Sequence, residues 1–161
     1  MTILEGLKAE HRVFLSVFDQ IERDLPKVKT VDEIKFVSRV LQGLLYEHGQ
    51  EENDLAYIAL DHILKQRNQQ TRLYHDHQEI DGLLDKIEEL EDVPEARAQL
   101  KAALNACRCH FNEEETVVFP LIAKALQPET LEALGRVWKP QPAPNPSGPK
   151  RRLGSSPTGM R

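Results

Sequence analysis

Apolar residues recur at intervals of three and four along most of the chain, which is the period of an amphipathic α-helix. Runs of β-branched residues are short, and glycine and proline are sparse before residue 139. The pattern predicts four long helices and one short C-terminal helix, over about 2–25, 30–59, 68–90, 94 to beyond 121, and 128–138. Because the predicted connections are short, we expect an all-α, up-down-up-down four-helix bundle.

Several residues mark where these helices begin, end or bend. Thr30 and Glu33 have the spacing of a capping box at the start of the second helix, and Pro26 ends the first. Pro94 is typical of a first helical turn. Pro120 lies inside the fourth helix and lacks a backbone N–H, so we expect a bend there.

The predicted inward face of each long helix contains residues that can bind metal. The first and third helices each place one histidine on this face, and the second and fourth each place a histidine followed four residues later by a glutamate. The resulting candidate set is His11, His48, Glu52, His77, His110 and Glu114. On the fourth helix we expect the same face to continue through Val117 and Leu121.

The two halves of the sequence repeat each other. HRVFLSVFDQI, which begins at His11, aligns with HQEIDGLLDKI, which begins at His77, and apolar residues occur at the same four offsets. HGQEE from His48 likewise matches HFNEE from His110. A single histidine on an apolar face is more often an ordinary core residue. A duplicated set on four successive helices is hard to explain by packing, and it favours a metal site.

The types of these residues suit a pair of metal ions. Residues four apart on a helix lie about 40° apart around the axis, so each His/Glu pair can address neighbouring metal positions. Buried carboxylates and imidazoles need partners, and two metals would satisfy all six groups. Imidazole with carboxylate suits iron or manganese, whereas structural zinc is usually four-coordinate and rich in sulfur.

Other polar residues are expected to lie outside the metal set. We expect His62 and His75 to be surface residues and Cys107 to be a small core residue. Three acids next to the candidate glutamates are expected to be solvated or to support the ligands from outside: Glu51, Glu113 and Glu115. Glu115 also remains an alternative to Glu114 as a ligand.

Charge and apolar run length exclude several classes of function. The chain of 161 residues has a net charge of −5, and all 26 acids but only 16 of the 21 bases lie in residues 1–138. This strongly acidic body argues against nucleic-acid binding. No apolar run approaches the roughly 20 residues that span a membrane, and no secretory signal is evident, so we expect a cytoplasmic protein.

The composition changes at residue 139. Residues 139–161 contain six of the ten prolines, five bases and no acids, so we expect a disordered tail after a bundle domain at residues 1–138. The basic KRR cluster in this tail could contact an acidic protein partner, although a solubilising extension is the preferred interpretation.

The order His, His-x-x-x-Glu, His, His-x-x-x-Glu, with its second pair inside HFNEEETVVFP, resembles the hemerythrin-like HHE cation-binding domains over residues 7–126. The resemblance implies a four-helix bundle with a carboxylate-bridged centre of two Fe ions. It assigns His11 and His48 to one iron and His77 and His110 to the other, with Glu52 and Glu114 as bridges.

The sequence departs from the oxygen-carrying hemerythrins at one position. Those proteins have a further histidine one turn before the third-helix ligand, where this chain has Leu73. The departure makes the two halves nearly equivalent and argues against a pair with one saturated and one open iron. Tyr74 remains an alternative ligand at this point.

Three classes of function fit the predicted site. The preferred one is a protein that binds or responds to oxygen, peroxide, nitric oxide or iron. The alternatives are a redox enzyme that turns over peroxide or oxidises ferrous iron, and a bundle with a vestigial site. The sequence supplies no substrate pocket or electron-transfer motif that decides whether the protein is an enzyme.

Overall fold

The computed structural model describes the backbone of residues 1–57 and 69–138, and the side chains of residues 1–57 and 75–138. The tail at 139–161, His62 and the predicted end of the second helix therefore lie outside the described residues. The side chains of Leu73 and Tyr74 do so as well.

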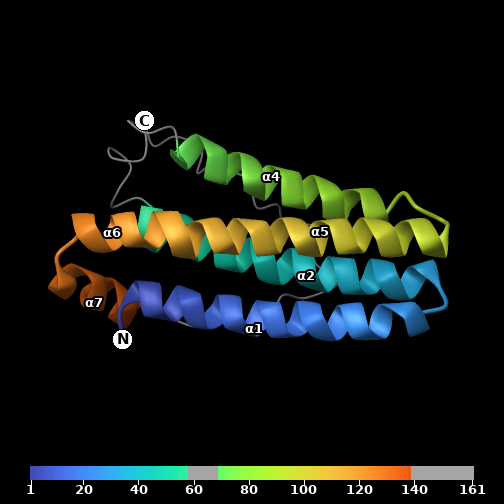
Figure 1. Ribbon diagram of the computed structural model, residues 1–161, viewed down its shortest axis with the longest axis horizontal. Helices are drawn as coiled ribbons and strands as arrows, with labels where there is room; N and C mark the ends of the chain where they lie inside the picture. Colours follow the sequence, from blue (N-terminus) through green and yellow to red (C-terminus); the bar gives the residue numbers. More distant parts are fainter. Residues whose placement is uncertain (58–68, 139–161) are drawn as a thin grey trace.

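The described residues form an all-α bundle of antiparallel helices, as the sequence predicts. In Figure 1, α1, α2, α4 and α5 run alternately in opposite directions along the length of the molecule. Their bounds are Ile3–Asp24 for α1, Val31–Glu51 for α2, Gln69–Ile87 for α4 and Val93–Glu113 for α5. None of the described helices is both long enough and apolar enough for a lipid bilayer crossing.

Side-chain caps fix the starts of the long helices. Thr30 and Glu33 form the predicted capping box before α2, and Thr2 forms a second one with Glu5 before α1. At α5 the Asp92 side chain accepts the backbone N–H of Glu95. Each cap satisfies N–H groups that the first helical turn leaves without a partner.

Both helices that carry a His-x-x-x-Glu pair widen at the glutamate. A π-helical segment, η2, covers Glu52–Tyr57 after α2, and a second, η4, covers Glu114–Val118 after α5. The Phe119 N–H donates to the carbonyl oxygen of Glu114, five residues earlier. Helix α6, Phe119–Ala125, follows in the same direction as α5 (Figure 1).

The helix is irregular near Pro120, where we expected a bend, and the irregularity takes the form of a π-helical segment. Pro120 lies in the first turn of α6, where its missing N–H is accommodated by the widened segment just before it. The irregularity begins at Glu114, six residues before the proline. The π-helical segment thus ends directly before the helix whose first turn contains the proline.

The widening also corrects the predicted inward face. A π turn holds one more residue than an α turn, so each later residue takes the position that its predecessor would have in a regular helix. Val117 is consequently 38% exposed, while Val118 is 1% exposed. Leu121 is half-buried, and Ile122 takes the buried position.

Two apolar clusters lie on either side of the polar residues on these helices. One contains Phe18, Leu41, Leu84 and Leu104 with their neighbours. The other contains Ile3, Leu7, Tyr57, Phe119 and Leu131 with theirs. Along α1, and along α2 with η2, the candidate metal residues come between members of the two clusters, so apolar side chains lie on both sides of the site there.

The short helix α7, Pro128–Val137, closes the bundle beside the start of α1 (Figure 1). Directly after it, the Trp138 indole Nε1 donates to Glu51 Oε2 at 2.6 Å. Glu51 is buried and accepts a hydrogen bond from this indole, so the expectation that it is solvated is wrong. Burial of this carboxylate is tolerated because the indole N–H supplies a partner.

Gly135 allows α7 to approach the N-terminal backbone. A Cβ at Gly135 would lie 2.8 Å from the Thr2 carbonyl carbon and 2.9 Å from the Ile3 nitrogen, whereas a Cβ at Gly82 meets nothing within 4 Å. We expect Gly135→Ala to lower the free energy of unfolding by roughly 1 to 3 kcal/mol through overpacking.

The matched control is Gly82→Ala on α4, which should raise the free energy of unfolding by roughly 0.5 to 1 kcal/mol because alanine favours the helix. Denaturant unfolding of both variants measures the difference. Equal effects of the two substitutions would contradict the close approach of α7.

Candidate metal centre

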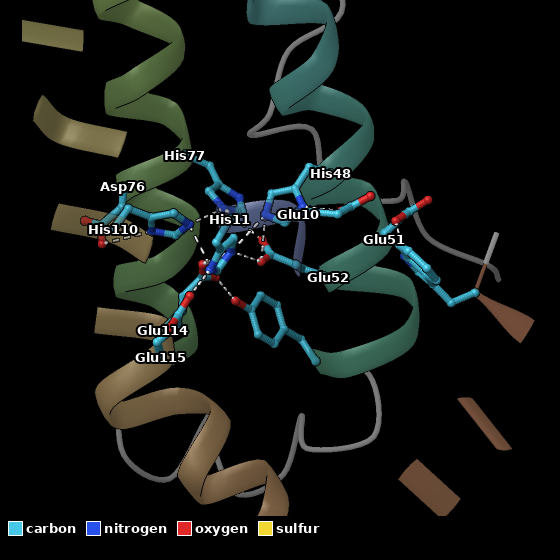
Figure 2. Close-up of polar contacts among 12 residues, drawn as sticks. Glu10, His11, His48, Glu51, Glu52, Asp76, His77, His110, Glu114 and Glu115 are labelled. Carbon is cyan, nitrogen blue, oxygen red and sulfur yellow. Dashed lines mark hydrogen bonds and ion pairs between the residues drawn. The ribbon is translucent and has the colours of Figure 1, made fainter. Parts of the chain in front are cut away.

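All six predicted metal-binding residues converge in the bundle core. Figure 2 shows their side chains pointing toward one another from the helices on which they lie. Each is at most 5% exposed, and they form two overlapping groups that could hold a metal ion. The groups are His11, His48, Glu52 and Glu114, and Glu52, His77, His110 and Glu114.

The four histidines form two pairs. The Nε2 atoms of His11 and His48 lie 3.0 Å apart, and those of His77 and His110 lie 2.8 Å apart. At most one proton can lie between two such nitrogens, so each pair offers at least one lone pair to a shared cation. The pairing is the one that the sequence resemblance implies.

The two glutamates each reach both histidine pairs. Glu52 Oε1 lies 3.1 Å from His48 Nε2, and Glu52 Oε2 lies 3.7 Å from His77 Nε2. Glu114 Oε2 lies 3.4 Å from His11 Nε2, and Glu114 Oε1 lies 3.3 Å from His110 Nε2. Each carboxylate thus offers one oxygen to either pair, which is the arrangement of a bridge between two ions (Figure 2).

The local electrostatics distinguish the histidines. Burial opposes protonation of His48, yet the carboxylates of Glu52, Glu10 and Glu114 together outweigh it and raise the pKa of His48 to about 10. Burial likewise opposes the charge on His110, but Glu114 and Asp76 raise its pKa to about 10. Burial, together with the charge of His110, lowers the pKa of His77 to about 3. In the second pair, the surroundings therefore favour a proton on His110 over one on His77.

The buried Glu52 carboxyl remains ionised. Burial would raise the pKa of Glu52, but the charge of His48 and hydrogen bonds from His11 and His48 hold it well below its usual range. The site therefore combines anionic oxygen with imidazole nitrogen, the donor set that suits iron or manganese.

Carboxylates outside the cluster contact the outer nitrogens of three histidines. His11 Nδ1 lies 2.9 Å from Glu115 Oε1, and His48 Nδ1 lies 2.7 Å from Glu10 Oε2. His110 Nδ1 lies 3.7 Å from Asp76 Oδ2. Glu115 thus contacts the outer nitrogen of His11, in agreement with the expectation that it supports a ligand from outside. Glu114, and not Glu115, belongs to the two groups that could hold a metal ion.

Aromatic rings cover one side of the site. The Phe111 ring stacks on His11 with ring centroids 4.1 Å apart and planes 13° apart. The centroid of the Phe119 ring lies 5.6 Å from the centroid of the same imidazole. The Tyr57 hydroxyl donates to Glu114 Oε1 and is buried. These contacts keep water from the inner nitrogens and fix the orientation of one carboxylate.

Sequence reasoning missed Tyr57, Glu10 and the aromatic cover. A signal for Tyr57 exists, since Tyr57 follows Glu52 by five residues just as Phe119 follows Glu114. In a regular helix, a residue five positions after a glutamate lies on a different face. The π-helical segments place these rings on the same face as the glutamates. Glu10 directly precedes His11, a spacing that a helical-face argument assigns to another side.

The remaining candidate residues lie elsewhere. His75 is exposed, as predicted, and groups with Asp76 and Glu79 at the surface. Cys107 is a buried core residue, and its burial raises the pKa of the thiol to about 12. Cys109 is exposed, and neither cysteine forms a disulfide.

Buried atoms without hydrogen bonds show that the cluster fits a cation. Among the described residues, Glu52 Oε2 and Glu114 Oε2 are buried without a hydrogen-bond partner. An unpaired buried carboxylate oxygen is costly, and it becomes favourable when it coordinates a metal. The residues present therefore suit bound metal.

One comparison with known proteins agrees with this geometry. The family model described as "Hemerythrin HHE cation binding domain" matches residues 2–122, which include all six clustered residues. No curated protein and no solved structure matches the chain.

Proposed function

Because the chain belongs to the hemerythrin family of HHE cation-binding domains, we propose that it holds two iron ions and binds or responds to oxygen, peroxide, nitric oxide or iron. His11 and His48 would hold one ion, and His77 and His110 the other. Glu52 and Glu114 would bridge them.

The sharing of Glu52 and Glu114 between both histidine pairs is the observation that carries the proposal. Each carboxylate directs one oxygen to each pair, and both are fully buried. A site for one ion would need neither two imidazole pairs nor two shared carboxylates. Buried ligands of this type recur in bundle proteins that hold two metals.

The surrounding residues supply the conditions that such a centre needs. Bound iron would contribute redox chemistry and coordination positions for small oxygen- or nitrogen-containing ligands. Phe111 and Phe119 exclude water from the His11 side, and Tyr57 holds Glu114 by a hydrogen bond. Glu10 and Glu115 accept from the outer nitrogens and so direct Nε2 of His48 and His11 inward.

The alternative function is a redox enzyme that turns over peroxide or oxidises ferrous iron. Optical spectra of the reduced protein before and after addition of oxygen, peroxide or nitric oxide distinguish the two functions. Stoichiometric adducts that form without consumption of excess ligand support binding or sensing. Catalytic consumption of peroxide, or continuing oxidation of added ferrous iron, supports the enzyme.

Metal analysis tests the iron centre itself. We expect iron-reconstituted protein to contain close to two irons per chain, with magnetic coupling between them, because the ligands form two groups that share two carboxylates. His77→Ala should lower the iron content, whereas the control His75→Ala should leave it unchanged because His75 is exposed. One uncoupled iron per chain would refute the proposal.

A further inference from the structure

The two metal positions differ in what surrounds their histidines. Carboxylate contacts of 2.9 and 2.7 Å hold the outer nitrogens of His11 and His48. The contact between His110 and Asp76 is 3.7 Å, which is too long for a hydrogen bond. His77 Nδ1 has no hydrogen-bond partner among the described residues. Only the first pair therefore has both rings anchored from outside.

An outer carboxylate strengthens a histidine as a metal ligand in two ways. It fixes the proton on Nδ1 and the orientation of the ring, so that Nε2 keeps its lone pair toward the ion. It also makes Nε2 more basic. Loss of such a partner typically weakens metal binding by about 10- to 100-fold.

Packing adds to the difference between the pairs. The His11 ring stacks against Phe111 and Phe119, and the ring centroids of Phe14 and His48 lie 5.2 Å apart. His110, in contrast, lines a groove of about 440 Å³ between α4 and α5. Rings held by neighbours lose less freedom when they bind an ion, so packing favours the first pair as well.

The two oxygens of the Glu114 carboxylate also differ in their hydrogen bonds. Tyr57 donates to Glu114 Oε1, which is the oxygen on the His110 side. The hydrogen bond withdraws electron density from this oxygen and weakens it as a ligand for the second position. Glu114 Oε2, on the His11 side, has no hydrogen-bond partner among the described residues and keeps its full capacity.

We propose that Glu10 and Glu115 are positioning residues that make the His11/His48 position the tighter of the two, so that divalent metal fills it first and the His77/His110 position second. The inference rests on the proposed binding of two metals. It adds an order of loading and names the residues that set that order.

Titration of the metal-free full chain with Co²⁺, followed by absorption spectra and calorimetry, tests the order. We expect two steps with dissociation constants at least about tenfold apart, because the anchored pair gains the advantage of its outer carboxylates. Magnetic coupling should appear only in the second step. His77→Ala should keep the first step, whereas His11→Ala should remove it.

Three charge-neutralising variants test whether the outer carboxylates cause the tighter binding at the first position. Glu10→Gln and Glu115→Gln should each weaken the first step by about tenfold, because each removes a charged partner of one anchored histidine. Asp76→Asn is the comparison at the other position, and it should leave the first step unchanged because Asp76 contacts His110, which belongs to the second pair. Circular dichroism checks that each variant keeps its helices.

The results separate this inference from the proposed function. Two steps with equal constants, or a first step that Glu10→Gln and Glu115→Gln leave unchanged, would overturn the inference while two-metal binding stands. Binding of only one Co²⁺, or of none, would overturn the proposed function as well.

Discussion

Glu52→Ala is expected to abolish iron loading at both positions, although it removes only one side chain. Glu52 belongs to both candidate metal groups, and its two oxygens face different histidine pairs. Loss of an outer partner alone costs about 10- to 100-fold in affinity, so loss of a bridging ligand should cost more than about 100-fold at each position. Iron content should fall from two per chain to almost none.

The choice of control for this experiment follows from the structure. Glu51 is unsuitable, because its carboxylate accepts the Trp138 indole N–H and its loss would disturb the attachment of α7. Glu113 precedes Glu114, lies outside both candidate groups and is only half-buried. Glu113→Ala should therefore retain two irons. Full loading of Glu52→Ala, measured by elemental analysis after reconstitution, would contradict a bridging role.

Removal of metal is expected to produce the largest change in stability. Two sites that are each saturated at a thousandfold excess over the dissociation constant contribute about 4 kcal/mol apiece, or about 8 kcal/mol together. For a domain of this size, that corresponds to roughly 15 to 30 °C in the melting temperature. Differential scanning calorimetry with and without a chelator measures the shift.

The physical reason is the burial of Glu52 and Glu114. Both side chains are fully buried, and each has one oxygen without a hydrogen-bond partner among the described residues. Coordination compensates these oxygens, and its loss leaves their desolvation uncompensated. Addition of Fe²⁺ should restore the melting temperature, whereas Mg²⁺ should not, because Mg²⁺ prefers oxygen ligands and retains its waters. A melting temperature that is the same with and without chelator would exclude tight binding.

Order of loading connects these two predictions. If the His11/His48 position fills first, one equivalent of metal should give more than half of the total stabilisation, because that position has the lower dissociation constant. The second equivalent should then add a smaller increment. The same calorimetric titration therefore reports on the proposed roles of Glu10 and Glu115.

The sequence by itself determined the helices and the composition of the cluster. Apolar periodicity predicted the four long helices, and the Thr30/Glu33 capping box is present as expected. The repeat of His and His-x-x-x-Glu predicted which residues meet in the core. These features are readable because helical faces depend on spacing along a single element, and spacing is visible in one sequence.

Tertiary structure decided the rest, beginning with the two π-helical segments. A regular helical period beyond Glu114 would place Val117 inward, whereas the π-helical segment buries Val118 and Ile122. One additional residue per turn shifts every later side chain, and the regular helical period does not reveal where such a turn occurs.

The sequence also did not predict which carboxylates contact the outer nitrogens of His11 and His48. Glu115 is 104 residues from His11, and Glu10 is 38 residues from His48. Such contacts depend on the rotation and offset of neighbouring helices, which spacing within one helix does not fix. The sequence therefore supplied two nearly equivalent halves, and the tertiary packing made them different by anchoring His11 and His48 more firmly than His77 and His110.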